Sequence, residues 1–286
     1  MRVTLVLNPG AGSGATSPDM LRQAIEAAGH QVEVREAKKK KVAKVLDDPG
    51  DLLVVAGGDG TVGRVIKSLA GSDVTMTILP TGTANNIATS LGIRGEPEAL
   101  ARRWEKLTVR RVDVGTARGP WGETRFVESV GVGLLGELIH PEVGDDIEGT
   151  DEARSEARRV ARSLAAPFRR VEIDGQDRSA NYLLLEAMNI RCAGPNLWLA
   201  DHARAGDGKL EIVRALERDR PALVALADTF GTSRATLTTE QAKRMLVWCE
   251  ADELHVDDEH GSELGEWTGM APVEVMMEGE SVKVLA

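Results

Sequence analysis

The chain has 286 residues, of which 42% are hydrophobic and 28% are charged. This balance supplies enough apolar surface for a folded core and excludes a wholly disordered chain. The 35 Lys and Arg residues against 45 Asp and Glu residues give a net charge of −10, whereas bulk binding of nucleic acid needs a dominant positive field. The length suits two domains of ordinary size.

Cysteine usage and hydropathy narrow the class of protein further. The two cysteines, Cys192 and Cys249, exclude a disulfide framework and a multi-cysteine zinc site. The five histidines show no metal-ligand spacing, and we expect none of them to bind a metal. The apolar run at residues 3–7 is too short for a signal peptide, and no run of about 18 apolar residues occurs that would span a membrane. We therefore expect a cytoplasmic protein whose contact with the inner membrane face would be peripheral.

The first hundred residues alternate between strand-like and helix-like patterns. Short apolar runs or polar–apolar alternation predict strands at residues 3–7, 31–35, 52–56 and 74–79. Apolar residues at helical spacing predict helices at residues 18–28, 39–46, 62–69 and 83–91. Strands that are apolar on both faces and separated by helices indicate a doubly wound parallel sheet, which is an α/β fold. Ligands of such sheets bind at the carboxyl ends of the strands.

The pattern changes near residue 107, after which strands predominate. Strand-like patterns occur at residues 109–116, 124–130, 170–173, 181–189, 210–214, 253–257, 273–277 and 282–285. Two helices interrupt them, one at residues 151–164 and one that begins at Asp219 and Pro221 and ends near Phe230. We therefore predict an α/β domain at residues 1–108, followed by an all-β domain with antiparallel strands at residues 109–286.

Gly-rich turns follow three of the predicted parallel strands. Residues 8–14 read Asn-Pro-Gly-Ala-Gly-Ser-Gly, residues 57–61 Gly-Gly-Asp-Gly-Thr, and residues 80–86 Pro-Thr-Gly-Thr-Ala-Asn-Asn. Glycines let backbone N–H groups approach an anion, and a helix N-terminus favours negative charge. One such turn would equally suit a strand-to-helix connection without a ligand, but three on one sheet edge predict a polyphosphate site. We expect Thr61 to cap the next helix, and Asp59 to hold a metal or to order the phosphate site.

Together these turns resemble the motifs of the diacylglycerol kinase catalytic superfamily. This group includes bacterial soluble lipid kinases and, more distantly, sphingosine, ceramide and NAD kinases. The resemblance continues in order through residues 126–133, residues 189–194 with Ala203, the Asp-Gly-Lys-Leu segment at residues 207–210 and Asp-Asp-Glu at residues 257–259. It implies a nucleotide-binding, NAD kinase-like catalytic domain at residues 1–108 and a β-sandwich lipid-substrate domain at residues 109–286.

The resemblance also implies an activity and its residues. The activity is Mg²⁺-dependent transfer of the γ-phosphate of ATP to a lipid hydroxyl, with Glu259 as the general base and Asp59 as a second catalytic residue. Residues implied in nucleotide binding are Asn8, Gly57, Gly58, Asp59, Gly60, Thr61, Thr83 and Asn85. Residues implied in metal binding are Asp207 and the carbonyl-bearing neighbours Arg204 and Lys209. The chemistry agrees, because phosphoryl transfer needs neutralised charge and a positioned acceptor, and Mg²⁺ prefers few carboxylates.

The chain departs from the family pattern at several positions. Gly63 and Arg64 stand where the family has Asn-Glu, Asn86 replaces an acidic residue, Asp201 stands where the family usually has a proline, and Asp258 replaces the glycine of Asp-Gly-Glu. If that glycine adopts positive φ, Asp is among the better substitutes. Two alternatives stay open: a kinase of a soluble substrate such as NAD, and a non-catalytic nucleotide- or lipid-binding relative.

The helix predicted at residues 151–164 carries Arg154, Arg158 and Arg162 at helical spacing. Such a basic stretch could meet anionic lipid headgroups. Alternatively, it is a solvated helix balanced by Glu152 and Glu156. We expect a membrane lipid as the substrate and no nucleic acid as a partner. The sequence leaves the oligomeric state open, a homo-oligomer included.

Overall fold

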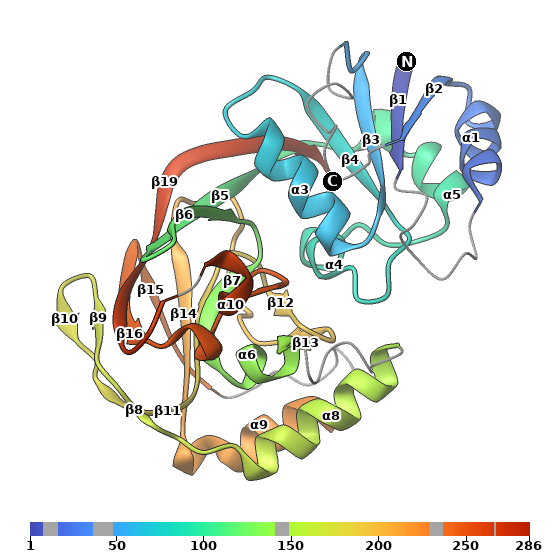
Figure 1. Cartoon of the computed structure of the whole chain (residues 1–286). Coiled ribbons are helices and arrows are strands. Elements are labelled where there is room, and N and C mark those ends of the chain that lie inside the picture. The colour runs from blue at the N-terminus through green and yellow to red at the C-terminus, as the bar shows by residue number, and fades with distance from the viewer. Residues whose placement is uncertain (8–16, 37–47, 141–148, 229–236, 266) are drawn as a thin grey trace. The chain divides into compact units, whose positions relative to one another are not determined.

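The computed structural model describes residues 1–7, 17–36, 48–140, 149–228, 237–265 and 267–286. These residues form two compact units (Figure 1): Met1–Asp113 with Glu280–Ala286, and Val114–Gly279. The end of the chain therefore returns to the first unit, which the division expected after residue 108 does not include. In the part of the chain just defined, no helix has the length and hydropathy needed to cross a membrane.

The first unit contains a parallel sheet in which the strands follow the order β4–β3–β1–β2. Its strands are β1 (Arg2–Leu7), β2 (Gln31–Glu36), β3 (Leu52–Gly57) and β4 (Thr75–Pro80). β1 pairs in parallel with β2 and β3, and β3 pairs in parallel with β4. Every residue of β3 is buried, as expected of an apolar strand that is covered on both faces. The predicted parallel sheet is therefore confirmed.

The helices of this unit are α1 (Pro18–Ala27), α3 (Asp59–Leu69), α4 (Asn86–Leu91) and α5 (Pro97–Ala101). A short 3-10 helix, η1, follows at Trp104–Lys106. α1 begins where the sequence predicts, because Ser17 accepts a hydrogen bond from the Met20 amide (3.2 Å) and Pro18 occupies the first turn. The helix predicted at residues 39–46 lies outside the described residues.

The second unit is a β-sandwich with a helical layer. One of its sheets is antiparallel and follows the order β15–β14–β11–β7–β17–β18, with β8 paired to β11. Its strands are β7 (Ser129–Gly133), β8 (Phe168–Arg169), β11 (Ala180–Met188), β14 (Leu210–Leu216), β15 (Thr238–Ala242), β17 (Leu254–Val256) and β18 (Glu259–His260). The facing strands are β5 (Val109–Gly119), β6 (Gly122–Phe126), β9 (Val171–Ile173), β10 (Gln176–Asp177), β16 (Arg244–Cys249) and β19 (Ala271–Leu285).

Two apolar cores hold these layers together. Leu185 and Ala187 of β11 face the core between the two sheets, whereas Leu184 and Met188 face a second core, as the alternation of a strand requires. Three helices cover that second core: α6 (Leu134–Ile139), α8 (Thr150–Ser163) and α9 (Arg220–Asp228). α8 and α9 lie side by side (Figure 1). The smaller elements are η2 (Glu217–Asp219), η3 (Ala251–Glu253), α10 (Gly261–Leu264) and the pair β12 (Cys192–Ala193) and β13 (Leu197–Trp198).

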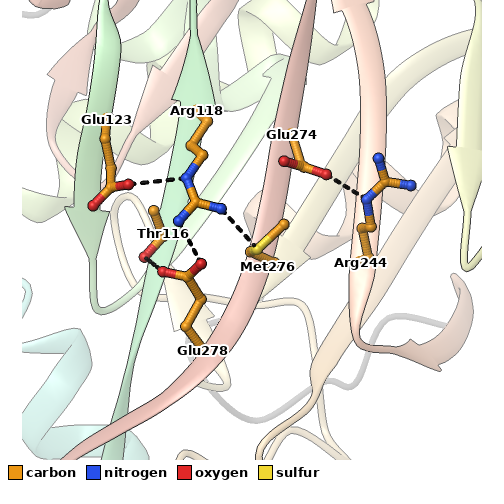
Figure 2. A network of polar contacts seen from close by, with 7 residues as sticks. All are labelled: Thr116, Arg118, Glu123, Arg244, Glu274, Met276 and Glu278. Carbon is orange, nitrogen blue, oxygen red and sulfur yellow. Dashed lines mark hydrogen bonds and ion pairs between the residues drawn. The ribbon is translucent and has the colours of Figure 1, made fainter.

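A polar network joins side chains of β5, β6 and β19 (Figure 2). Arg118 donates through Nε to Glu123 (2.9 Å) and through a terminal nitrogen to Glu278 (2.5 Å). Thr116 donates to the other oxygen of Glu278 (2.9 Å). Because Arg118 and Glu278 come from different strands, the network links neighbouring strands by their side chains.

Two strand predictions are wrong in their limits. The strand predicted at residues 124–130 is two strands, β6 and β7, because the amides of Val127 and Glu128 donate to the carboxylate of Asp257. The strands predicted at residues 273–277 and 282–285 are one strand, β19, which passes through Gly279 at φ 85°.

Candidate active site

Two Gly-rich turns meet at the carboxyl ends of β3 and β4. Gly57 ends β3, and its carbonyl accepts a hydrogen bond from the Thr81 amide (3.2 Å). A Cβ atom on Gly82 would lie 2.3 Å from the Cα atom of Gly58. The turns therefore touch backbone to backbone, and a side chain at residue 82 would force them apart.

Asp59 fastens the two turns to each other. Its two carboxylate oxygens accept hydrogen bonds from the amides of Asn86 and Ile87, each at 2.9 Å. These amides belong to the first turn of α4, where N–H groups lack intrahelical acceptors. Asp59, the first residue of α3, thus caps α4 with a negative charge. These contacts order the two turns, and the roles expected of Asp59 at a phosphate or metal site stay predictions.

The second turn closes through Asn85. Its backbone is left-handed, at φ 52°, and its side-chain amide both accepts from the Gly82 amide (3.0 Å) and donates to the Gly82 carbonyl (2.6 Å). The helix predicted from residue 83 therefore begins only at Asn86, and Thr83 is exposed in the turn before it. Asn8 and its Gly-rich turn lie outside the described residues.

The predicted capping role of Thr61 is wrong. α3 begins at Asp59 with Gly58 as its N-cap, and the amides of Thr61 and Val62 donate to the Gly58 carbonyl (3.1 and 3.0 Å). Thr61 is consequently a buried residue inside the helix that packs against Gly57. Because the N-cap Gly58 has no side chain, it supplies no side-chain acceptor to the first N–H groups of α3. These half-buried N–H groups are suited to an anionic ligand.

A polar cavity of about 850 Å³ lies in the second unit. The residues that line it are Arg191, Asp201, His202, Arg204, Asp207, Lys209, Glu211, Thr239, Glu240 and Gln241. All three residues expected at the metal site are therefore brought together. The Asp207 carboxylate accepts from the Lys209 amide (3.1 Å), and the Asp207 amide donates to the Arg204 carbonyl (3.3 Å). Gly208 completes this turn at φ 71°.

Glu211 is a residue of this cavity that sequence reasoning missed. Its side chain is 4% exposed, and its Oε2 atom has no hydrogen-bond partner in the described structure. A buried carboxylate oxygen is costly unless a donor or a cation reaches it. No group of three His, Cys, Asp or Glu side chains with metal-site spacing occurs among the described residues. Asp207 and Glu211 line the same cavity, and a divalent cation there would need backbone carbonyls and water as its other ligands.

Glu259 lies in a tight hairpin between β17 and β18, where Val256 pairs with Glu259. Its side chain is exposed, so the carboxylate is accessible to a substrate. The turn residues are Asp257 and Asp258. Positive φ occurs at Asp257 (53°) and not at Asp258, so the idea that Asp258 replaces a glycine of positive φ is wrong for this chain. Asp is tolerated in this conformation because its short polar side chain can bond locally.

Asp257 ties this hairpin to the segment before β7. Its buried carboxylate accepts from the amides of Val127 (3.0 Å) and Glu128 (2.7 Å), and its own amide donates to the Ser129 carbonyl (2.8 Å). The predicted site residues thus fall into two sets. One set comprises the Gly-rich turns of the first unit, and the other comprises the cavity and the hairpin of the second.

The arginines of α8 are engaged with protein groups. Arg154 is buried and donates through Nε to the Pro195 carbonyl (3.2 Å), whereas Arg158 pairs with Asp228 of α9 (2.6 Å). Arg162 is exposed. These contacts favour a helix whose arginines are balanced by acidic residues over a basic face for lipid headgroups. The acidic partner of Arg158 is, however, Asp228 and not Glu152 or Glu156.

Comparison with known proteins agrees with this arrangement. Residues 2–117 match the model of the diacylglycerol kinase catalytic domain. A diacylglycerol kinase of Mycobacterium tuberculosis is 25% identical over 99% of this chain and 94% of that protein. One from Bacillus subtilis is 24% identical over 99% of each chain. A crystal structure of a diacylglycerol kinase from Bacillus anthracis has the same fold, with a TM-score of 0.69 at 20% identity over 99% of this chain and 96% of that one.

The predicted resemblance to the diacylglycerol kinase catalytic superfamily is therefore confirmed: residues 2–117 match the model of its catalytic domain, and almost the whole chain is similar to diacylglycerol kinases.

Proposed function

We propose that the protein is a Mg²⁺-dependent lipid kinase that transfers the γ-phosphate of ATP to the hydroxyl group of a diacylglycerol-type lipid. The observation that carries the proposal is the backbone contact between Gly58 and Gly82. This contact, together with the hydrogen bonds of Asp59, holds two Gly-rich turns side by side at the carboxyl ends of β3 and β4. Ligands of open α/β sheets bind at that edge. The similarity of the chain to diacylglycerol kinases supports the same activity.

The chain's own residues supply binding and proton transfer. Residues 57–61, with Thr83 and Asn85, bind the phosphates of ATP, chiefly through the first N–H groups of α3, which have no acceptor within the helix. Glu259 accepts the proton of the lipid hydroxyl as its oxygen bonds to the γ-phosphorus atom, and the bond from that phosphorus to the leaving ADP breaks. Mg²⁺, when bound by Asp207, Glu211 and the carbonyls of Arg204 and Lys209, supplies positive charge that offsets the buried carboxylate.

The acceptor is proposed to be a lipid, and so the protein would act at a membrane surface. Its substrate lies in a bilayer, and the described residues contain no helix that could span one. We therefore propose a cytoplasmic protein that contacts the inner membrane face peripherally. Arg162 and Phe168, both exposed, are residues that such a contact could use.

The test is a phosphorylation assay with two acceptors. The purified protein is incubated with Mg²⁺, γ-labelled ATP and either mixed vesicles that contain diacylglycerol or free NAD. We expect label in the lipid, and a loss of about 10²–10⁴-fold in rate for Glu259→Gln, because a positioned general base contributes that much. Asp258→Asn, at the exposed neighbouring position, is the matched control and should keep the rate.

Other outcomes would replace this proposal. Label on NAD alone would make the protein a kinase of a soluble substrate. Binding of ATP without transfer to either acceptor, or to a total bacterial lipid extract, would make it a non-catalytic relative. Full activity of Glu259→Gln would remove Glu259 from the proton transfer.

A further inference from the structure

A buried charged pair lies on the strands next to the Glu259 hairpin, and the proposed reaction does not use it. His255 of β17 is 1% exposed and Glu186 of β11 is 0% exposed. Nε2 of His255 lies 3.0 Å from both carboxylate oxygens of Glu186. Nδ1 of the same ring lies 3.0 Å from the carbonyl oxygen of Asp257, the first residue of the hairpin turn.

The partners fix where the protons lie. A backbone carbonyl can only accept, so Nδ1 of His255 donates to Asp257. Nε2 faces the carboxylate of Glu186, which accepts a hydrogen bond from Nε2 when the ring carries its second proton. Burial lowers the pKa of His255, but the Glu186 carboxylate and the Asp257 carbonyl outweigh it and raise that pKa above its ordinary value. The protonated imidazole donates to Glu186 of β11 and to the carbonyl of Asp257, and so links β11 to the hairpin turn.

Gly131 makes this pair possible. β7 runs between β11 and β17, and Gly131 is paired with Glu186 on one side and with His255 on the other. A Cβ atom on Gly131 would lie 2.3 Å from Cδ of Glu186. With no side chain in the middle of the row, the Glu186 and His255 side chains meet across the intervening strand.

The hairpin turn is consequently held from two directions. His255 holds the carbonyl of Asp257, and the amides of Val127 and Glu128 hold its carboxylate. Glu259 follows two residues later, at the start of β18. Two apolar side chains of similar volume would avoid the cost of burying charge and are often no less stable. They could not, however, donate a hydrogen bond to Asp257.

We propose that Glu186 and His255 are positioning residues for Glu259: the pair holds the hairpin at residues 256–259 in the conformation that presents the Glu259 carboxylate to the acceptor hydroxyl. This inference rests on the proposed function, since it takes Glu259 as the base. The pair itself touches no substrate and acts through the backbone of Asp257.

The test compares two double variants that differ in one hydrogen-bond donor. Glu186→Leu with His255→Leu removes both the charges and the donor. Glu186→Leu with His255→Asn removes the charges but keeps an amide N–H near the position of Nδ1. We expect the first to lower kcat by up to about 10²-fold with KM for ATP unchanged, because small misplacements of a reacting group cost that much. The second should recover most of kcat.

Two further readouts separate positioning from general damage. In the Glu259→Gln background, the double-leucine change should lower kcat no further, because groups that act as one unit are not additive. Hydrogen exchange of the peptide that covers residues 256–260 should be faster in the double-leucine variant and near wild type in the Leu–Asn variant. If the double-leucine variant does not fold, Glu186→Met with His255→Phe replaces it.

Each outcome decides the proposal. The proposal would be overturned if the double-leucine change lowered kcat in the Glu259→Gln background by the same factor as in the wild type. It would also be overturned if hydrogen exchange of the peptide covering residues 256–260 were unchanged. A wild-type protein that phosphorylates no lipid would instead remove the proposed function. The exchange measurement would then still decide whether the pair orders the hairpin, so the two failures are distinguishable.

Discussion

At the scale of single residues, two aspartates of the predicted motifs perform the same task. Asp59 places its carboxylate on the amides that begin α4, and Asp257 places its carboxylate on two amides before β7. Each is next to residues that the proposed reaction needs. Each carboxylate holds a turn in place by accepting hydrogen bonds from another segment of the chain. In the proposed reaction, nearby backbone N–H groups bind phosphate and Glu259 accepts the proton.

Asp59→Asn should loosen the second Gly-rich turn. An asparagine keeps one acceptor oxygen but presents a donor to the other amide, so one hydrogen bond to a charged group is lost. We expect a loss of about 1–3 kcal/mol in the free energy of unfolding, together with weaker ATP binding. Urea denaturation and titration calorimetry with ATP measure the two effects. Asp258→Asn, at an exposed position, serves as the control, and an equal loss there would contradict the role given to Asp59.

The buried pair of Glu186 and His255 should make stability depend on pH. The pKa of His255 is raised in the folded protein, so the folded state holds the proton more tightly than the unfolded state, in which the pKa is about 6.5. The stabilisation is therefore complete below that value and is lost as the pH rises through the folded pKa. Denaturation midpoints of the wild type, relative to the double-leucine variant, should fall as the pH rises. A constant difference would show that His255 does not titrate with folding.

Sequence reasoning found the residues whose function is local and missed those whose function depends on register. Gly58 and Asn85 stand in Gly-rich turns that can be recognised from adjacent residues. Glu186, Gly131 and His255 come from three strands far apart in the chain, and no local pattern indicates that they share a row. Glu211 was missed for a similar reason, since its burial depends on the elements packed over β14.

At the scale of elements, two helix boundaries follow from the turn residues directly before them, and one strand boundary follows from a distant aspartate. α3 begins at Asp59 because Gly58 accepts its first hydrogen bonds, and α4 begins after Asn85, whose left-handed backbone precedes the helix. The strand at residues 124–130 is interrupted because Asp257 captures two of its amides. The element types were predictable, since apolar runs and helical spacing are local, whereas the contact of Asp257 with residues 127 and 128 is not.

Arg220 fastens the end of α8 to the start of α9. Its terminal nitrogens donate to the carbonyls of Ala161 and Leu164, each at 2.7 Å, at the end of α8 where the last carbonyls of a helix lack N–H donors from a following turn. Arg220→Met keeps the apolar stem but removes both donors, and we expect a loss of about 1–2 kcal/mol in the free energy of unfolding. Urea denaturation of Arg220→Met and of the exposed control Arg218→Met tests this. Equal stability of the two variants would show that the carbonyls are satisfied without Arg220.

At the scale of the whole molecule, the end of the chain belongs to the first unit. Residues of β19 pair with β4 in parallel, at Lys283 with Thr75 and Val284 with Met76. Val282 and Val284 are 0% exposed, and the Thr77 hydroxyl donates to the Leu285 carbonyl (2.9 Å). The parallel sheet is thus completed by residues that the chain reaches last. The sequence pattern places these residues in the second domain, because it contains no signal that they pair with β4.

Removal of residues 280–286 should therefore destabilise the unit that carries the Gly-rich turns. The deletion uncovers the edge of β4 and exposes apolar surface that Val282 and Val284 cover, and two buried valines contribute about 3–6 kcal/mol at most. We expect faster hydrogen exchange in β3 and β4 and weaker ATP binding, with exchange of β11 and β14 unchanged. Lys283→Gln, which removes only the surface ion pair with Asp73, should leave all four strands as in the wild type. Equal acceleration of exchange in both units would mean that the segment stabilises the molecule as one cooperative body, and unchanged exchange in β4 would mean that its pairing with β19 contributes nothing.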